Sequence, residues 1–194
     1  MATAYDYVVL TLAPVPTPHQ ALAAHVRTLA GVDVLGQFAP QLGWVNNEAA
    51  VLLRRSEAVS GDVRAIAAPA LVTDYRVEPL TATPRPADDD RPSPGGIYVH
   101  RWFEVDPGAV DEFVDLSGQG WERFESLFDA RIFGLFRAPD GAGPIARLLL
   151  ITRYGDHGAW QASRDPSTEA MRIFARRQQL TRRTWAASTL LVSP

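Results

Sequence analysis

The sequence contains no cysteine and no lysine, and all 19 of its basic side chains are arginine. Without cysteine there are no disulfides, thiol nucleophiles or thiolate metal sites, and without lysine there is no Schiff-base chemistry. The formal net charge of −3 provides no global positive field to attract a nucleic acid backbone. We therefore expect no nucleic-acid partner and no cofactor.

Long hydrophobic runs are also missing, because no apolar stretch approaches the roughly 20 residues that a membrane-spanning helix requires. The first residues, Met1 to Asp6, lack the basic and apolar regions of a secretory signal. A hydrophobic fraction of 46% and a charged fraction of 21% are ordinary for a globular chain that buries its own core. These features predict a cytoplasmic protein with no membrane partner.

The clearest internal boundary runs from Pro79 to Gly96. It contains five prolines, three consecutive aspartates and a terminal pair of glycines, a composition that neither a helix nor a central strand accepts. We interpret residues 79–96 as an extended linker between an N-terminal unit, residues 1–78, and a C-terminal unit, residues 97–194.

The C-terminal unit predicts the order strand, helix, hairpin, helix, strand. Asp106-Pro107 and Asp165-Pro166 each supply an N-cap acceptor before a residue preset to helical φ, so both open a helix. We expect Gly118 and Gly120 to kink or break the first of these helices. The predicted strands, bounded by turn residues, are 97–105, 131–136, 146–154 and 185–192.

The N-terminal unit repeats this order in a degenerate form. Its first helix opens at Thr17-Pro18, and its second, around residues 61–68, is short. The hairpins match best, since Leu35-Gly36-Gln37-Phe38 resembles Phe133-Gly134-Leu135-Phe136. Such an internal repeat predicts an α+β fold of two tandem ferredoxin-like βαββαβ units. The strands expected in this unit are 5–12, 32–39, 44–54 and 71–77.

Several predicted strands, among them 5–12 and 147–151, are apolar or aromatic on both faces. A four-stranded antiparallel sheet with helices on one face normally leaves its other face to solvent, so here the uncovered face requires a partner. The same face of the other copy is the nearest one. We therefore predict an intramolecular, pseudo-dimeric α/β barrel that needs no second chain and exists as a monomer or weak homodimer.

Residues 97–108 resemble the opening strand of the NIPSNAP family, in the dimeric α/β-barrel superfamily. The family pattern has an aromatic residue, an arginine, a second aromatic residue and then Pro-Gly. The positions that match it are Tyr98, Arg101, Phe103, Pro107 and Gly108. The resemblance extends over roughly residues 96–192 and implies the barrel fold. It implies no specific reaction, since the superfamily includes cofactor-free monooxygenases, haem enzymes and ligand-binding proteins.

His100 and Arg101 are adjacent candidates for function. Strand alternation places Tyr98, His100 and Trp102 on one face and Arg101 among apolar residues on the other. A buried arginine requires an acceptor, either a carboxylate of the protein or an anionic ligand. His100 has two interpretations, a hydrogen-bonded core histidine or a general base or haem ligand.

Other motifs favour structural interpretations. His19, His25 and His157 have no metal-ligand spacing, so no metal site is expected. No serine lies in a Gly-x-Ser-x-Gly motif, which argues against a serine hydrolase. A group of arginines near the C-terminus is typical of a solvated helix face: Arg172, Arg176, Arg177, Arg182 and Arg183.

Two functional hypotheses follow. The first is a NIPSNAP-like protein that binds a small apolar or aromatic molecule in the barrel. The second is an enzyme of the same fold, either a cofactor-free monooxygenase or a haem protein that uses His100. In both cases we expect a cavity in the C-terminal unit, because residues that break simple apolar patterning there often mark sites. It is predicted to be lined by some of Tyr98, His100, Arg101, Trp121 and Tyr154.

Overall fold

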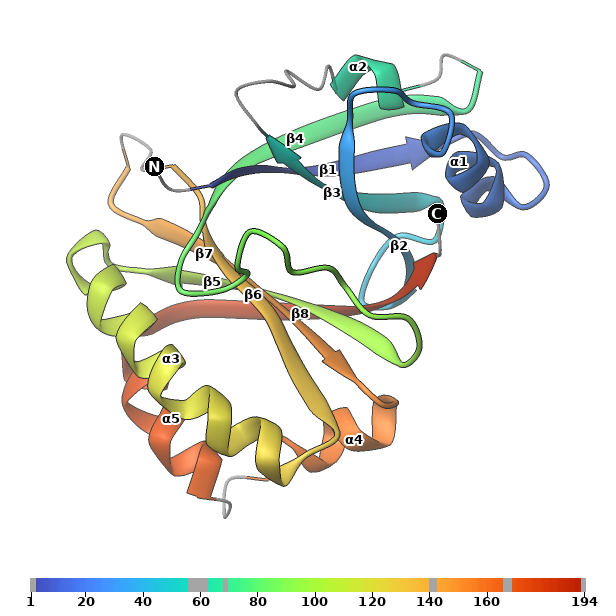
Figure 1. Ribbon diagram of the computed structural model, residues 1–194. Helices are drawn as coiled ribbons and strands as arrows, with labels where there is room; N and C mark the ends of the chain where they lie inside the picture. The colour runs from blue at the N-terminus through green and yellow to red at the C-terminus, as the bar shows by residue number, and fades with distance from the viewer. Residues whose placement is uncertain (1–2, 56–62, 68–69, 140–142, 166–168, 193–194) are drawn as a thin grey trace. The chain divides into compact units, whose positions relative to one another are not determined.

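The computed structural model describes residues 3–55, 63–67, 70–139, 143–165 and 169–192. Its elements follow the order βαββαβ twice, with additional short helices in the second half (Figure 1). The chain forms two compact units that differ from the two sequence halves. The first comprises Met1–Thr81, Arg91–Gly95 and Ala187–Pro194, and the second comprises Ala82–Asp90 and Gly96–Ala186.

The first unit is built on antiparallel strands. Strand β1 lies between β3 and β4, and β2 pairs with the other edge of β3. The end of the last strand, β8 (Thr181–Val192), pairs with β2. The remaining elements are β1 (Ala4–Leu12), α1 (Pro18–Val26), β2 (Asp33–Leu42), β3 (Glu48–Arg55), α2 (Val63–Ile66) and β4 (Val72–Ala82).

Both faces of β1 are buried, as its composition predicts. Val8 and Leu10 pack on one face with Leu22 of α1, while Tyr5 and Tyr7 are buried on the other. Helix α2 is a single turn, in agreement with the short helix expected at 61–68, of which residues 61–62 and 68 lie outside the described residues.

Strand β4 extends through Pro79 to Ala82, so it includes the first four residues of the predicted linker. Pro79 lies opposite Asp6 in the antiparallel register of β4 and β1.

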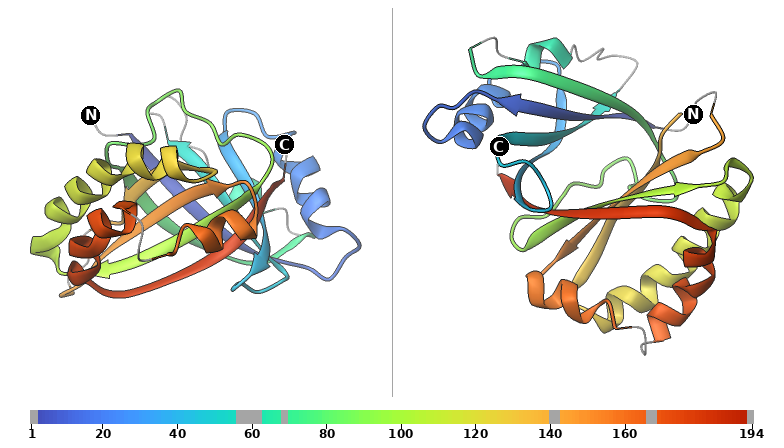
Figure 2. Two further views of the ribbon diagram at one scale, coloured as in Figure 1. Left: turned by 90° about the horizontal axis from the view of Figure 1, so that it is seen from below. Right: turned by 180° about the vertical axis from the view of Figure 1, so that it is seen from behind.

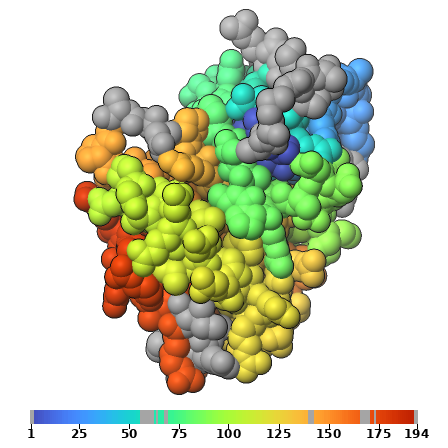
Figure 3. All heavy atoms as spheres, turned by 60° about the vertical axis from the view of Figure 1, so that its left-hand side comes forward, coloured from blue at the N-terminus to red at the C-terminus, as the bar shows by residue number. Residues whose placement is uncertain are grey.

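Helices cover one face of the strands of the second unit (Figure 2), and residues of these helices lie on its outer surface (Figure 3). Strand β7 lies between β5 and β6 and is antiparallel to both, and α3 packs against α5. Residues 82–90 run beside β6, where the Thr83 N–H donates to the Leu135 carbonyl at 3.0 Å. The elements are β5 (Ile97–Val105), η1 (Pro107–Ala109), α3 (Val110–Leu127), β6 (Ala130–Arg137), β7 (Ala146–Tyr154), α4 (His157–Ala162) and α5 (Glu169–Leu180).

Helix α3 runs without interruption over 18 residues, so the break expected at Gly118 and Gly120 is wrong. Each glycine costs about 1 kcal/mol in a helix. Phe113, Trp121 and Phe124 bury their rings at helical spacing on both sides of the glycines, and burial of each ring contributes more than that cost.

No helix is predicted around His157, yet His157 is the first residue of α4, because the Asp156 carboxylate accepts a hydrogen bond from the Ala159 N–H at 2.7 Å and caps the helix. The helix expected to open at Asp165-Pro166 is α5, which is described from Glu169 onwards, and residues 166–168 lie outside the described residues. The predicted α+β fold class, with elements in the ferredoxin-like order, is confirmed.

Candidate functional site

Arg101 lies on the face of β5 that the helices of the second unit cover. Its alternate neighbours Val99 and Phe103 belong to the hydrophobic core that includes Phe113 of α3. His100, one residue earlier, is buried on the opposite face. Strand alternation therefore separates the two adjacent candidates, and Arg101 alone faces the helices.

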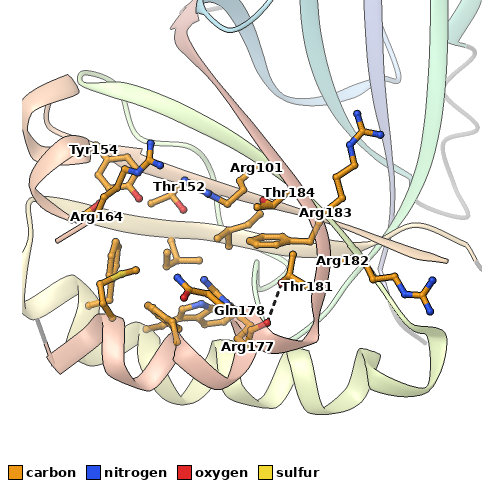
Figure 4. Close-up of a pocket in the computed structure, with 18 residues that line it drawn as sticks. Arg101, Thr152, Tyr154, Arg164, Arg177, Gln178, Thr181, Arg182, Arg183 and Thr184 are labelled. Atoms are coloured by element: carbon orange, nitrogen blue, oxygen red, sulfur yellow. Dashed lines mark hydrogen bonds between the residues drawn. The ribbon is translucent and has the colours of Figure 1, made fainter. Parts of the chain in front are cut away.

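A cavity of about 420 Å³ lies between the strands and helices of the second unit (Figure 4). Its volume is within the usual range for sites that bind small molecules. Strands β5, β7 and β8 contribute one side, and α3 and α5 contribute the other. The apolar part of the wall is largely aromatic and includes Phe103, Trp121, Phe124, Leu150, Met171 and Phe174.

Five arginines line this cavity, but they differ in direction. Arg101 and Thr152 approach it from the strands, Arg177 and Gln178 approach it from α5, and Arg164 lies beside Tyr154 (Figure 4). The side chains of Arg182 and Arg183 point away from it. The partly buried Arg101 and Arg177 therefore place their guanidinium groups at the cavity, while Arg164 lines it as an exposed residue.

Arg177 is surrounded by aromatic rings. Its guanidinium carbon lies 4.1 Å from the ring centroid of Phe174 and 5.3 Å from that of Phe103. A hydrogen bond of 3.3 Å to the Ser117 hydroxyl also holds it. Burial, reinforced by the positive charge of Arg101, lowers the pKa of Arg177 to about 9. Its charge is therefore costly in the absence of an anion.

Burial also lowers the pKa of Arg101. The phenol of Tyr154 opposes this shift, and the positive charge of Arg164 adds to it. No carboxylate contributes to the pKa of Arg101 or Arg177, and within the described part of the chain neither forms an ion pair. Arg101 therefore has no salt-bridge partner among the described residues.

Tyr154, at the end of β7, is a further polar group that can reach a bound molecule. Burial raises the pKa of Tyr154, while a hydrogen bond with Ser163 and the charges of Arg101 and Arg177 oppose that increase. The phenol is thus protonated at neutral pH. It can donate a hydrogen bond or accept one beside the arginines.

The structure brings together three of the five candidates named from the sequence. Arg101, Trp121 and Tyr154 line the cavity, whereas Tyr98 and His100 are buried on the other face of β5 and do not line it.

Sequence reasoning missed Arg177, which was assigned to a solvated face together with Arg172 and Arg176. Those two are exposed, but Arg177 lies three residues after the buried Phe174. It therefore shares the apolar face of α5, and its position at helical spacing was the available signal.

Comparison with solved structures identifies similar folds over the whole chain. An anthrone oxidase-like protein is 14% identical with a TM-score of 0.66, covering 100% of this chain and 92% of that one. A candidate monooxygenase from Fusobacterium nucleatum is 12% identical with a TM-score of 0.66, covering 99% and 93%. A variant of chlorite dismutase from Candidatus Nitrospira defluvii is 8% identical with a TM-score of 0.64, covering 99% and 91%. The fold is that of the dimeric α/β-barrel proteins.

No family model and no curated protein matches the chain. Within the described residues, no group of three or more histidine, aspartate or glutamate side chains could hold a metal ion. None of the described helices is long and apolar enough to cross a membrane.

The cavity does not fit a haem group that depends on His100. That imidazole lies on the opposite face of β5, and the lining contains no histidine. Burial lowers the pKa of His100 to about 3, which is the behaviour of a neutral core histidine. No chemistry is therefore assigned to haem in this cavity.

Proposed function

We propose that the chain is a NIPSNAP-like α/β-barrel protein that binds a small aromatic or apolar molecule in the cavity of its second unit. The observation that carries this proposal is the aromatic wall formed by Phe103, Trp121 and Phe174 around a volume of about 420 Å³. Flat rings offer large contact areas to planar ligands at little entropic cost. A few polar groups beside such a wall are typical of sites that fix a ligand's orientation.

A larger side chain at position 171 should weaken ligand binding, because it fills part of the cavity. Met171 is partly buried and lines the cavity, so Met171→Trp places an indole in the volume that a ligand would occupy. We expect the Met171→Trp variant to bind the neutral probe 2-naphthamide about tenfold or more weakly than the parent does, as measured by isothermal titration calorimetry. The control Met171→Leu conserves volume and should bind as the parent does. Equal affinities in all three proteins would place the binding site elsewhere.

The natural ligand can be sought directly. Mass spectrometry of the denatured protein, purified without added small molecules, should release an aromatic compound from the parent but not from Met171→Trp. A compound released equally by both proteins would contradict binding in this cavity.

Cofactor-free oxygenation is the second candidate function, favoured by the resemblance to oxidase-like and monooxygenase folds. An ionised phenol or enol held by Arg101 is electron-rich and can react with dioxygen. A methylene group would then become a carbonyl, with one oxygen atom of O2 retained and the other leaving as water with both hydrogens. Anthrone is the probe for this reaction, and the protein should consume one O2 for each anthraquinone formed. A rate equal to the uncatalysed one would eliminate this candidate.

We further propose that the tandem chain is a monomer or weak homodimer, because two ferredoxin-like units in one chain replace the pair of chains that single-unit proteins require. Light scattering over a dilution series should report one chain per particle at low concentration. A dimer that dissociates only on unfolding would contradict this.

A further inference from the structure

The cavity of the second unit carries an imbalance of charge. Arg101, Arg164 and Arg177 line it, and its described lining contains no aspartate or glutamate. Arg176, the residue next to Arg177, provides the contrast, since it is exposed and pairs with Glu112 at 2.8 Å. The arginine on the outside of α5 has an anionic partner, and the one on the inside has none among the described residues.

Such an arrangement is unfavourable without a ligand. An unpaired charge removed from water loses solvation that aromatic contacts recover only in part. Arg177 also lies close enough to Arg101 for the positive charge of Arg101 to lower the pKa of Arg177. Buried charges are generally paired with a charge of opposite sign, and guanidinium is well shaped to bind two oxygens at once.

We propose that the ligand of this cavity is an aromatic oxyanion, whose charged oxygen binds between Arg101 and Arg177 and whose rings lie against the aromatic wall. The proposal rests on the proposed function and specifies its ligand class. Tyr154 contributes a hydrogen bond beside the arginines, and Arg164 adds positive charge near that phenol. A carboxylate and an ionised phenol share this chemistry.

The test compares charged and neutral probes of similar shape on the full chain. We expect 2-naphthoate to bind about tenfold or more tightly than the neutral 2-naphthamide, since charge-assisted hydrogen bonds add to ring contacts. A second anionic probe, 2,4-dinitro-1-naphtholate, distinguishes an ionised phenol from a carboxylate. Whichever anion binds more tightly identifies the preferred source of the charged oxygen.

Three arginine variants identify the groups responsible. Arg101→Met and Arg177→Met should each remove the preference for naphthoate over naphthamide while binding of the neutral probe persists. The matched control Arg176→Met, one residue away on the exposed face of α5, should retain the preference.

The melting temperature of the ligand-free protein gives an independent readout. Because methionine keeps an apolar stem without a charge, Arg177→Met should melt at a higher temperature than the parent. A structural arginine with an anionic partner would behave in the opposite way, and a lower melting temperature would overturn the proposal.

The binding outcomes separate this inference from the proposed function. Equal binding of naphthoate and naphthamide overturns the oxyanion while the aromatic site stands. Retention of the preference in both Arg101→Met and Arg177→Met also overturns it. Failure of all three probes to bind overturns the proposed function as well.

Discussion

Replacing Gly96 with alanine should lower the free energy of unfolding by about 3 kcal/mol or more. Gly96 precedes β5 and has a φ of +71°, a left-handed conformation that costs other residues about 1–2 kcal/mol. An added Cβ would also lie 2.1 Å from the carbonyl oxygen of Tyr154. That oxygen belongs to the backbone, so the clash can be relieved only by moving the paired strands.

Gly118→Ala is the matched control for this variant. Gly118 lies within α3, and an added Cβ there would meet no atom within 4 Å. Alanine should stabilise the helix by roughly 0.5–1 kcal/mol. Urea unfolding followed by circular dichroism measures both variants against the parent. If the two glycines gave changes of the same sign, the close approach at Gly96 would be wrong.

The same substitution should weaken ligand binding. Ile97, the next residue, pairs with Tyr154 in the register of β5 and β7, so displacement at Gly96 moves the strand end that places the Tyr154 phenol in the cavity. The glycine thus connects the stability of the hairpin with the geometry of the site.

The order of elements could be predicted from the sequence because turn residues separate most of the strands, although β4 continues into the predicted linker. Phe133-Gly134-Leu135-Phe136 lies within β6 and Leu35-Gly36-Gln37-Phe38 within β2, as the hairpin match implies. The errors arose where local propensity opposed tertiary packing. Helix propensity alone predicts a break at Gly118. The burial of Trp121 and Phe124 stabilises α3 by more than the glycine destabilises it, so the helix is continuous.

The site was predictable in part, for a similar reason. A period of two places Arg101 on the apolar face of β5, and the register then places Tyr154 on the same side through β7. The same alternation places Tyr98 and His100 on the opposite face of β5. The five candidates could therefore line one cavity only if that cavity reached both faces of the strand, which it does not. Arg177 lies far along the chain, and only the packing of α5 against α3 brings it to Arg101.

The hydrophobic core and the charged cavity have opposite effects on the stability of the second unit. Phe113, Leu135 and Leu148 are fully buried and stabilise the unit by excluding water. The same exclusion makes the charges of Arg101 and Arg177 expensive. Two such groups lower the stability of the ligand-free unit, and groups with perturbed pKa values in an apolar cavity are typical of functional sites. This supports a ligand for the cavity over a structural role for its arginines.

His100 should make the protein sensitive to acid. Its imidazole is buried, and burial lowers the pKa of His100 from 6.5 to about 3. Above pH 6.5 the imidazole is neutral in both the folded and the unfolded chain, so it adds no pH dependence. As the pH falls from 6.5 towards 3, the unfolded chain binds a proton that the folded chain excludes. Stability is therefore lost over that interval, at about 1.4 kcal/mol per pH unit and roughly 5 kcal/mol in all.

His100→Gln tests this directly, because an amide does not titrate. Between about pH 7 and about pH 4.5, the parent should lose roughly 2–3 kcal/mol more of its unfolding free energy than the variant. The control His157→Gln, at the partly exposed start of α4, should preserve the parent's loss. Urea titrations at the two pH values measure all three proteins. Equal losses in the parent and His100→Gln would show that the folded chain accepts a proton at His100. In that case the imidazole would be open to solvent and available for the acid–base role that its buried position on the far face of β5 argues against.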